Sequence, residues 1–223
     1  IPVFNESESI VFLIDEVISV MAANKLNFEL IVVNDGSKDD THQVLKQLTH
    51  KMTELSVICL RKNYGQTAAM AAGFDNSKGD IVITLDGDLQ NDPNDIPKLI
   101  SEINNGYDLI CGWRFDRKDK LINRKIPSKI ANKLIAKVTG LKLHDYGCSL
   151  KAFKKEIIDD IKLYGELHRF LPVLANIEGA RIKEIKVNHR SRKYGSSKYG
   201  IDRTFRVLMD LLTVWFMTKF LTR

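Results

Sequence analysis

Cysteine is scarce in this sequence of 223 residues, which holds only Cys59, Cys111 and Cys148. An odd number of cysteines does not make a complete disulfide framework, and no two of them have the Cys-x-x-Cys spacing of common zinc sites. The sequence therefore argues against a disulfide-stapled secreted domain and against a structural zinc site. Its few thiols fit a reducing, cytosolic environment.

Long apolar runs are also missing: no stretch of ~18 or more uncharged apolar residues occurs, so we expect no complete transmembrane helix in this sequence. No Gly-x-Gly-x-x-Gly motif follows a predicted strand, which argues against a dehydrogenase-type dinucleotide site. We find no internal repeat, low-complexity segment or interdomain linker. The sequence begins at Ile1, inside a predicted strand, so we expect a fragment with one sizeable core.

Positive charge is in excess, with 34 Lys and Arg against 28 Asp and Glu, a net charge of +6 and a pI near 9.1. The excess lies in the second half, where residues 112–133 hold eight basic side chains against two acidic ones and residues 181–206 hold nine against two. A basic surface favours an anionic partner. Nucleic acid, phosphate groups and a membrane surface all satisfy that description.

Apolar, β-forming runs alternate with segments of helical periodicity in the first half of the chain. This alternation predicts an α/β fold with a mostly parallel sheet flanked by helices, and the uninterrupted apolar character of the runs indicates burial on both faces. The expected strands are 29–33, 55–60, 81–85 and 107–111, and the expected helices are 7–23, 39–52, 65–77 and 94–105.

Polar residues follow each expected strand. Ligands of open α/β sheets bind beyond the carboxyl ends of the strands, so we expect these residues to meet at one edge. They are Asn5-Glu6, Asn34-Asp35-Gly36-Ser37, Arg61-Lys62-Asn63-Tyr64-Gly65, Asp86-Gly87-Asp88-Leu89-Gln90 and Gly112-Trp113-Arg114.

Asp86, Asp88 and Gln90 carry oxygen ligands at every second position. Alternate residues of an extended segment face the same way, so three oxygens could point at one Mg or Mn ion. The alternative is a solvated turn in which an aspartate caps the helix that begins after Pro93. The position of the triplet at the expected ligand edge favours the metal site.

Taken in order, these motifs resemble the signatures of inverting family-2 glycosyltransferases with the GT-A (Rossmann-like) fold. The resemblance is greatest to the polyprenyl-phosphate branch, which includes dolichol-phosphate mannose synthase and bacterial enzymes that load glucose onto undecaprenyl phosphate. It covers roughly the whole chain and extends from Pro2-Val3-Phe4-Asn5-Glu6 through Arg124-Lys125-Ile126-Pro127-Ser128 and His144-Asp145-Tyr146-Gly147-Cys148 to Arg192-Lys193-Tyr194-Gly195-Ser196-Ser197-Lys198.

The resemblance implies a donor site in which Asp86, Asp88 and Gln90 hold Mg or Mn against a nucleotide diphosphate, with Asp86 shared with the nucleotide. The residues implied to cradle the base and ribose are Pro2, Asn5, Glu6, Asp35 and Asn63. Asn34-Asp35 stands where Asp-Asp is frequent in the family, so only Asp35 is carried over.

The implied acceptor is a lipid phosphate, which is already anionic near neutral pH and needs positioning more than it needs a strong base. Arg114, Arg124, Ser128 and Arg192 match the positions that grip this phosphate, and Lys198 would hold either the diphosphate or the acceptor. Asp145 is the candidate catalytic carboxylate. Its role is a base, a ligand of a sugar hydroxyl or a loop cap.

The segment 200–223 has apolar residues at helical spacing interspersed with basic ones, a pattern typical of a helix in a membrane interface. We therefore expect a catalytic domain over 1–199 and an interfacial, juxtamembrane helix over 200–223. The alternative is that this helix packs on the domain or on a second copy in a homo-oligomer. The first interpretation places the catalytic domain on the cytoplasmic face of the cell membrane.

The sequence thus predicts transfer of a hexose, glucose from UDP-glucose in the specific form, to undecaprenyl phosphate. GDP-mannose is the alternative donor, because no residue visibly distinguishes uracil from guanine. A non-enzymatic binder of membranes or nucleic acid is the alternative from another class. Nucleic acid is not expected as a partner, because the acidic residues at the ligand edge repel a polyanion unless a metal is present.

Overall fold

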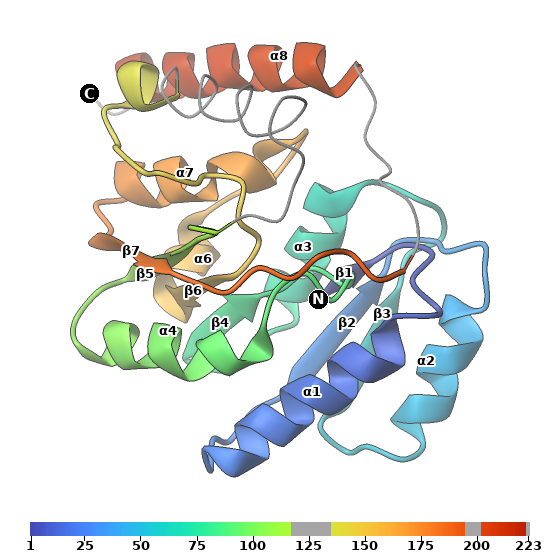
Figure 1. The fold of residues 1–223 in the computed structure, drawn as a ribbon. Helices are drawn as coiled ribbons and strands as arrows, with labels where there is room; N and C mark the ends of the chain where they lie inside the picture. The colour runs from blue at the N-terminus through green and yellow to red at the C-terminus, as the bar shows by residue number, and fades with distance from the viewer. Residues whose placement is uncertain (117–134, 195–201, 222–223) are drawn as a thin grey trace.

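The computed structural model describes residues 1–116, 135–194 and 202–221. Strands and helices alternate along the first half of the chain, as its periodicity predicts (Figure 1). In chain order they are β1 (Pro2–Val3), α1 (Ile10–Ala23), β2 (Leu30–Asn34), α2 (Thr41–Thr49), β3 (Leu55–Cys59), α3 (Gln66–Asp75), β4 (Ile81–Thr84), the short helix η1 (Pro93–Asp95), α4 (Ile96–Asn104) and β5 (Leu109–Trp113).

The first three strands form a parallel sheet with β2 between β1 and β3. Val32 and Val33 of β2 are fully buried, because α1 and α3 leave neither face of this strand to solvent. Parallel pairing brings the carboxyl ends of the three strands to the same edge. The loops that carry the predicted cradle for base and ribose begin there.

A second sheet has the order β4-β6-β5-β7, in which β6 (Lys151–Lys154) runs antiparallel to both neighbours and β5 pairs in parallel with β7 (Ile182–Lys186). The expectation of a mostly parallel sheet is thus confirmed with β6 as the exception. The strand expected at 107–111 is β5, and it lies at Leu109–Trp113. This shift puts Trp113 at the end of a strand, where Arg114 directly follows it.

Two apolar cores hold the elements together. One lies between α1, α4 and the sheets, with Ile10, Leu13 and Leu99 completely buried. The other surrounds Phe153 and Phe170 and packs the second sheet against the later helices. Those helices are α6 (Lys155–Asp160), η3 (Leu167–Phe170) and α7 (Leu171–Ile177).

The last helix, α8 (Asp202–Phe216), continues as a π-helical turn, η4 (Met217–Leu221), and lies above α7 in Figure 1. Leu211 and Val214 are buried in the second core, so α8 packs on the domain through one side. Its other side exposes large apolar residues. They are Met209, Leu212, Trp215, Phe216 and Phe220.

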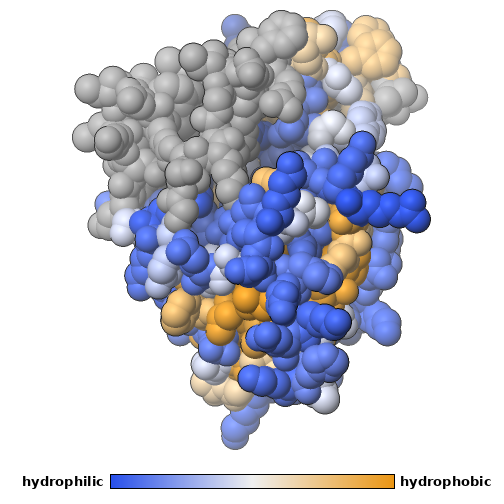
Figure 2. Space-filling model, turned by 90° about the vertical axis from the view of Figure 1, so that its right-hand side faces the viewer, coloured by the Kyte–Doolittle hydropathy of each residue, from blue (hydrophilic) through white to orange (hydrophobic). Residues whose placement is uncertain are grey.

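Among the residues coloured in Figure 2, most of those on the face drawn are hydrophilic, and hydrophobic ones reach the surface in separate patches, one of them at the height of α8. Within the described ranges, no helix combines the length and the apolar character that crossing a bilayer requires.

An apolar cavity of about 450 Å³ lies between the two sheets, lined by Ile1 and by residues of β1, β2 and β4 such as Ile31 and Ile83. Pro2 is the one predicted site residue among its lining residues. The cavity therefore belongs to the core rather than to the polar edge of the sheet.

Candidate active site

The polar loops after β1, β2 and β3 meet at one edge of the sheet, as predicted. The backbone N–H of Asn5 donates to Ser37 Oγ at 2.9 Å, and the N–H of Lys38 donates to Asn5 Oδ1 at 2.8 Å. The N–H of Glu6 donates to Thr41 Oγ1 at 2.9 Å. These reciprocal bonds fix the loop after β1 against the loop after β2.

Asp35 orders the loop after β3. Its carboxylate, only 3% exposed, accepts hydrogen bonds from the N–H of Tyr64 at 2.7 Å and from the N–H of Gly65 at 2.9 Å. Asn63 Nδ2 donates to the Asp35 carbonyl at 3.3 Å. The two predicted cradle residues Asp35 and Asn63 therefore lie together. Asn34, whose role the sequence left open, is a turn residue that accepts the N–H of Ser37 at 3.0 Å.

Two glycines allow these loops to approach so closely. Gly36 has a positive φ of 64°, and a Cβ there would lie 2.3 Å from the carbonyl carbon of Lys62. A Cβ on Gly87 would lie 2.7 Å from Val3 Cγ1. A side chain at either position would therefore push the loop after β2 or the loop after β4 out of place.

The segment 86–90 is a turn, not the extended run on which the sequence argument depended. Leu89 has φ 61°, an unusual conformation for a residue with a side chain, and Asn5 in the adjacent loop has φ 52°. Strained residues of this kind cluster at functional sites. Asp86 Oδ1 accepts from Gln66 Nε2 at 2.8 Å, while Asp88 and Gln90 face a different partner.

That partner is Arg192, whose Nη2 donates to Asp88 Oδ2 at 2.5 Å and to Gln90 Oε1 at 3.4 Å. Burial, and then the neighbouring Asp86 carboxylate, raise the pKa of Asp88 to about 6, against the lowering effect of Arg192. A carboxylate in such surroundings gains from a bound cation. The guanidinium thus places a positive charge between Asp88 and Gln90, two of the three predicted metal ligands.

The donor set fits a hard divalent ion, since carboxylate and amide oxygens are the ligands that Mg and Mn take. Within the part of the chain that the structure describes, no group of three His, Cys, Asp or Glu side chains is arranged to hold a metal. The predicted set of Asp86, Asp88 and Gln90 contains two carboxylates and an amide. It is therefore compatible with a site completed by the phosphate oxygens of a substrate.

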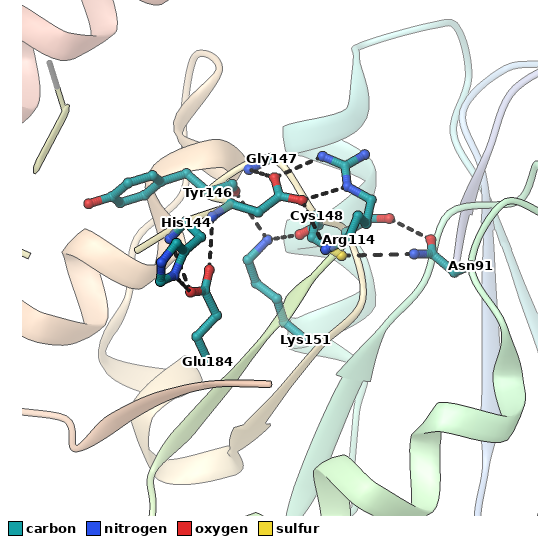
Figure 3. Close-up of polar contacts among 10 residues, drawn as sticks. Asn91, Arg114, His144, Tyr146, Gly147, Cys148, Lys151 and Glu184 are labelled. Atoms are coloured by element: carbon teal, nitrogen blue, oxygen red, sulfur yellow. Dashed lines mark hydrogen bonds and ion pairs between the residues drawn. The ribbon is translucent and has the colours of Figure 1, made fainter. Parts of the chain in front are cut away.

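Arg114, which directly follows β5, and Asp145, in the segment before β6, form a buried ion pair (Figure 3). Arg114 Nε donates to Asp145 Oδ2 at 2.7 Å and its Nη2 to Asp145 Oδ1 at 2.9 Å. The N–H groups of Arg114 and Gly147 also donate to this carboxylate, at 3.3 Å and 3.1 Å. Although burial acts in the opposite direction, Asp145 raises the pKa of Arg114 further above its ordinary value.

Glu184 on β7 supports this pair, and the sequence analysis assigned it no role. Its Oε1 accepts from the N–H of Asp145 at 2.8 Å, and its Oε2 accepts from the N–H of His144 at 3.0 Å and pairs with His144 Nδ1 at 2.7 Å. The His144 ring stacks on Trp113, with 4.1 Å between ring centroids. An acidic residue within the basic stretch 181–206 was the only signal in the sequence.

The remaining predicted site residues divide into two groups. Pro2 and Glu6 lie at the donor edge, where Glu6 accepts a bond from Ser9 Oγ at 2.8 Å. Arg124, Ser128 and Lys198 lie outside the described residues.

Comparison with known proteins identifies the family to which the chain belongs. The sequence profile described as Glycosyl transferase family 2 matches residues 1–162. The chain is 48% identical over its full length to the dodecaprenyl-phosphate galacturonate synthase of Rhizobium johnstonii, of which it covers 67%. It is 41% identical over 96% of its length to the undecaprenyl-phosphate 4-deoxy-4-formamido-L-arabinose transferase of Proteus mirabilis, of which it covers 65%. The chain thus spans about two thirds of these relatives.

Among solved structures, the chain resembles the glucosyl-3-phosphoglycerate synthase of Mycobacterium tuberculosis crystallised with Mn2+ and UDP-glucose. The TM-score is 0.71 and the sequence identity 18%, with 97% of this chain and 76% of that chain covered. At this identity the likeness bears on the fold alone, which is of the GT-A type.

Proposed function

Because the chain belongs to glycosyl transferase family 2, a family of enzymes, we propose that it transfers a sugar from a nucleotide diphosphate sugar to a polyprenyl phosphate. The observation that carries this proposal is the meeting of the acidic turn at Asp88 with Arg192. It brings donor and acceptor residues of the implied sites together. The relatives' names, which specify dodecaprenyl and undecaprenyl phosphates, support the same acceptor class.

Asp86, Asp88 and Gln90 would hold Mg or Mn in this proposal, and the bound metal would neutralise charge on the departing diphosphate. The loops around Pro2, Asn5 and Glu6 and around Asp35 and Asn63 form a rigid border on which the nucleotide would lie. Their hydrogen bonds to each other keep this border in place without the donor.

Arg114 and Arg192 would bind the acceptor phosphate, which attacks the anomeric carbon from the face opposite the leaving diphosphate and so inverts its configuration. The guanidinium of Arg114 faces Asp145 with its Nε and Nη2, and among bonds of the described residues none uses Nη1. That nitrogen is available for a phosphate oxygen. Arg124, Ser128 and Lys198 would complete the grip.

The sugar and base form the finer part of the proposal. If glucose is transferred from UDP-glucose, as predicted, the product is undecaprenyl phosphate glucose. The relatives reported above are instead named for galacturonate and for 4-deoxy-4-formamido-L-arabinose. Neither of these two is named for mannose. A panel of UDP-glucose, UDP-galacturonate, UDP-4-deoxy-4-formamido-L-arabinose and GDP-mannose, each with undecaprenyl phosphate and Mn, decides between these sugars by mass spectrometry of the lipid product.

The first test is a calorimetric titration of UDP, and of GDP for comparison, with and without Mn. We expect UDP to bind only with Mn, and we expect Asp88→Ala to weaken binding at least tenfold because a metal ligand is lost. Asp159→Ala, which removes an exposed carboxylate of α6, is the matched control and should bind as the parent does. A folded parent protein that binds neither nucleotide contradicts the proposed function.

The location follows from the acceptor. A polyprenyl chain is confined to the membrane, so we propose that the domain works at the cytoplasmic face of the cell membrane with the exposed apolar side of α8 in contact with lipid. The alternative occupant of that side, a second copy of the chain, would be detected as a concentration-dependent dimer by sedimentation.

A further inference from the structure

The carboxylate of Asp145 is saturated with donors. It accepts two bonds from the Arg114 side chain at 2.7 and 2.9 Å, one from the N–H of Arg114 at 3.3 Å and one from the N–H of Gly147 at 3.1 Å. A carboxylate has about four lone-pair sites. Asp145 therefore has no free site for a proton from a substrate while this pair is intact, which leaves it a poor general base.

The same bonds make Asp145 an effective support for Arg114. A bidentate pair of arginine and carboxylate fixes the plane of the guanidinium as well as its position. Asp145 is only 3% exposed, so water does not compete for these bonds. The direction of Arg114 Nη1 is consequently set by where Asp145 lies.

Asp145 is in turn held by Glu184. Both oxygens of Glu184 bind the segment 144–145: Oε1 accepts the N–H of Asp145 at 2.8 Å, and Oε2 accepts the N–H of His144 at 3.0 Å. The ring of His144 lies between the Glu184 carboxylate and the indole of Trp113. The close-up in Figure 3 shows Glu184 and Arg114 on opposite sides of this segment.

We propose that Glu184 is a positioning residue for the acceptor phosphate, acting through the backbone of His144 and Asp145 on the guanidinium of Arg114. This inference rests on the proposed function, since it requires that Arg114 binds phosphate. Glu184 lies on β7, which pairs with β5, and Arg114 directly follows β5. The register of β5 and β7 therefore sets the distance between Glu184 and Arg114.

The test measures binding of farnesyl phosphate, a soluble polyprenyl phosphate, to the chain in the presence of UDP and Mn. We expect Glu184→Gln to weaken this binding about tenfold, because an amide presents one acceptor oxygen where the carboxylate presents two. The affinity for UDP and Mn should stay the same. Inorganic phosphate, titrated in parallel, should show the same relative loss if the headgroup alone is recognised.

Glu102→Gln is the control, since it breaks an ion pair with Lys183 of the same strand, away from the site. It should leave farnesyl phosphate binding unchanged.

A double-mutant cycle separates positioning from a general loss of structure. If Glu184 acts through Arg114, then Glu184→Gln should add less than twofold to the loss caused by Arg114→Gln. The inference is overturned if the losses of farnesyl phosphate affinity in the two single variants multiply in the double variant, or if Glu184→Gln binds farnesyl phosphate as the parent does. In either case, binding of UDP by the parent would still support the proposed function. A parent chain that binds neither UDP nor farnesyl phosphate would overturn both.

Discussion

Arg192 lies at the contact between the donor and acceptor residues. Its Nη2 lies 2.5 Å from Asp88 Oδ2 and 3.4 Å from Gln90 Oε1. A divalent ion that uses these two oxygens must displace the guanidinium. In the proposed function the displaced Arg192 would then bind an anion, so one side chain would link metal binding to phosphate binding.

Arg192→Met should therefore bind Mn more tightly than the parent when no nucleotide is present. We expect a gain of about three- to tenfold, the range of a partly exposed ion pair of ~1 kcal/mol. Electron paramagnetic resonance of free Mn during a titration measures this directly.

Arg181→Met is the control, because Arg181 pairs with Asp108 at the other end of β7. Its Mn affinity should equal that of the parent. Equal or weaker Mn binding by Arg192→Met would show that the guanidinium does not compete with the metal.

The sequence predicted which polar segments meet at the edge of the sheet, because these segments belong to local motifs. Asp88 and Gln90 do lie together, although a tight turn with Leu89 at positive φ brings them together, where we had assumed an extended strand. Glu184 was not predicted because its role depends on a backbone segment about forty residues away, at a separation of 39 from Asp145. Spacing along the chain carries no sign of such a contact.

Among the secondary-structure elements, the strands β2 to β5 and the helices α1 to α4 were predictable, because apolar β-forming runs alternate with segments of helical periodicity in that part of the chain. β6 and β7 were not. β6 has only four residues with lysine at both ends, and β7 has two isoleucines among three charged residues without regular alternation. Their pairing with β5 is long-range, so tertiary contacts rather than local propensity make them strands.

Helix α3 is tied to η3 by a buried histidine. Thr67 Oγ1 lies 2.7 Å from His168 Nδ1, and His168 is 8% exposed. Burial, aided by the positive charges of Arg169 and Lys151, lowers the pKa of His168 to about 3. The folded protein therefore holds this imidazole neutral, whereas the unfolded chain protonates it near its ordinary pKa of about 6.5.

The free energy of unfolding should consequently fall as the pH drops from 6.5 toward 3, since the unfolded state binds the extra proton. His168 contributes up to about 1.4 kcal/mol per pH unit in that window and nothing to the slope above it. Urea denaturation between pH 7.5 and 5 measures the slope.

His168→Gln should flatten this pH dependence, because glutamine does not titrate. His50→Gln changes an exposed histidine at the end of α2 and should keep the slope of the parent. Equal slopes for His168→Gln and the parent would mean that His168 is protonated in the folded state.

For the whole molecule, the exposed apolar side of α8 predicts how the domain would meet a lipid surface. Trp215 is 40% and Phe220 52% exposed, and Lys219 lies over both rings. Trp215→Ser with Phe220→Ser should lower partition into anionic vesicles more than tenfold, since each aromatic contributes about 1.5–3 kcal/mol on burial. Co-sedimentation with phosphatidylglycerol vesicles measures it.

Phe12→Ser is the control, because Phe12 is 53% exposed on α1, a different part of the surface. Its partition should equal that of the parent. If the α8 double variant co-sediments with the vesicles as much as the parent does, the apolar side of α8 does not bind lipid. A second copy of the chain would then be its expected partner.

The position of β7 also governs when the site forms during synthesis. A nascent chain that has emerged only as far as α7 holds every acidic residue of the donor turn, yet it lacks the strand that pairs with β5 and the Glu184 that orients the segment 144–145. The bond from Arg192 to Asp88, 104 residues apart, forms later still. If the chain has the proposed function, a polypeptide released before β7 is made would therefore lack the acceptor site, whatever nucleotide it binds.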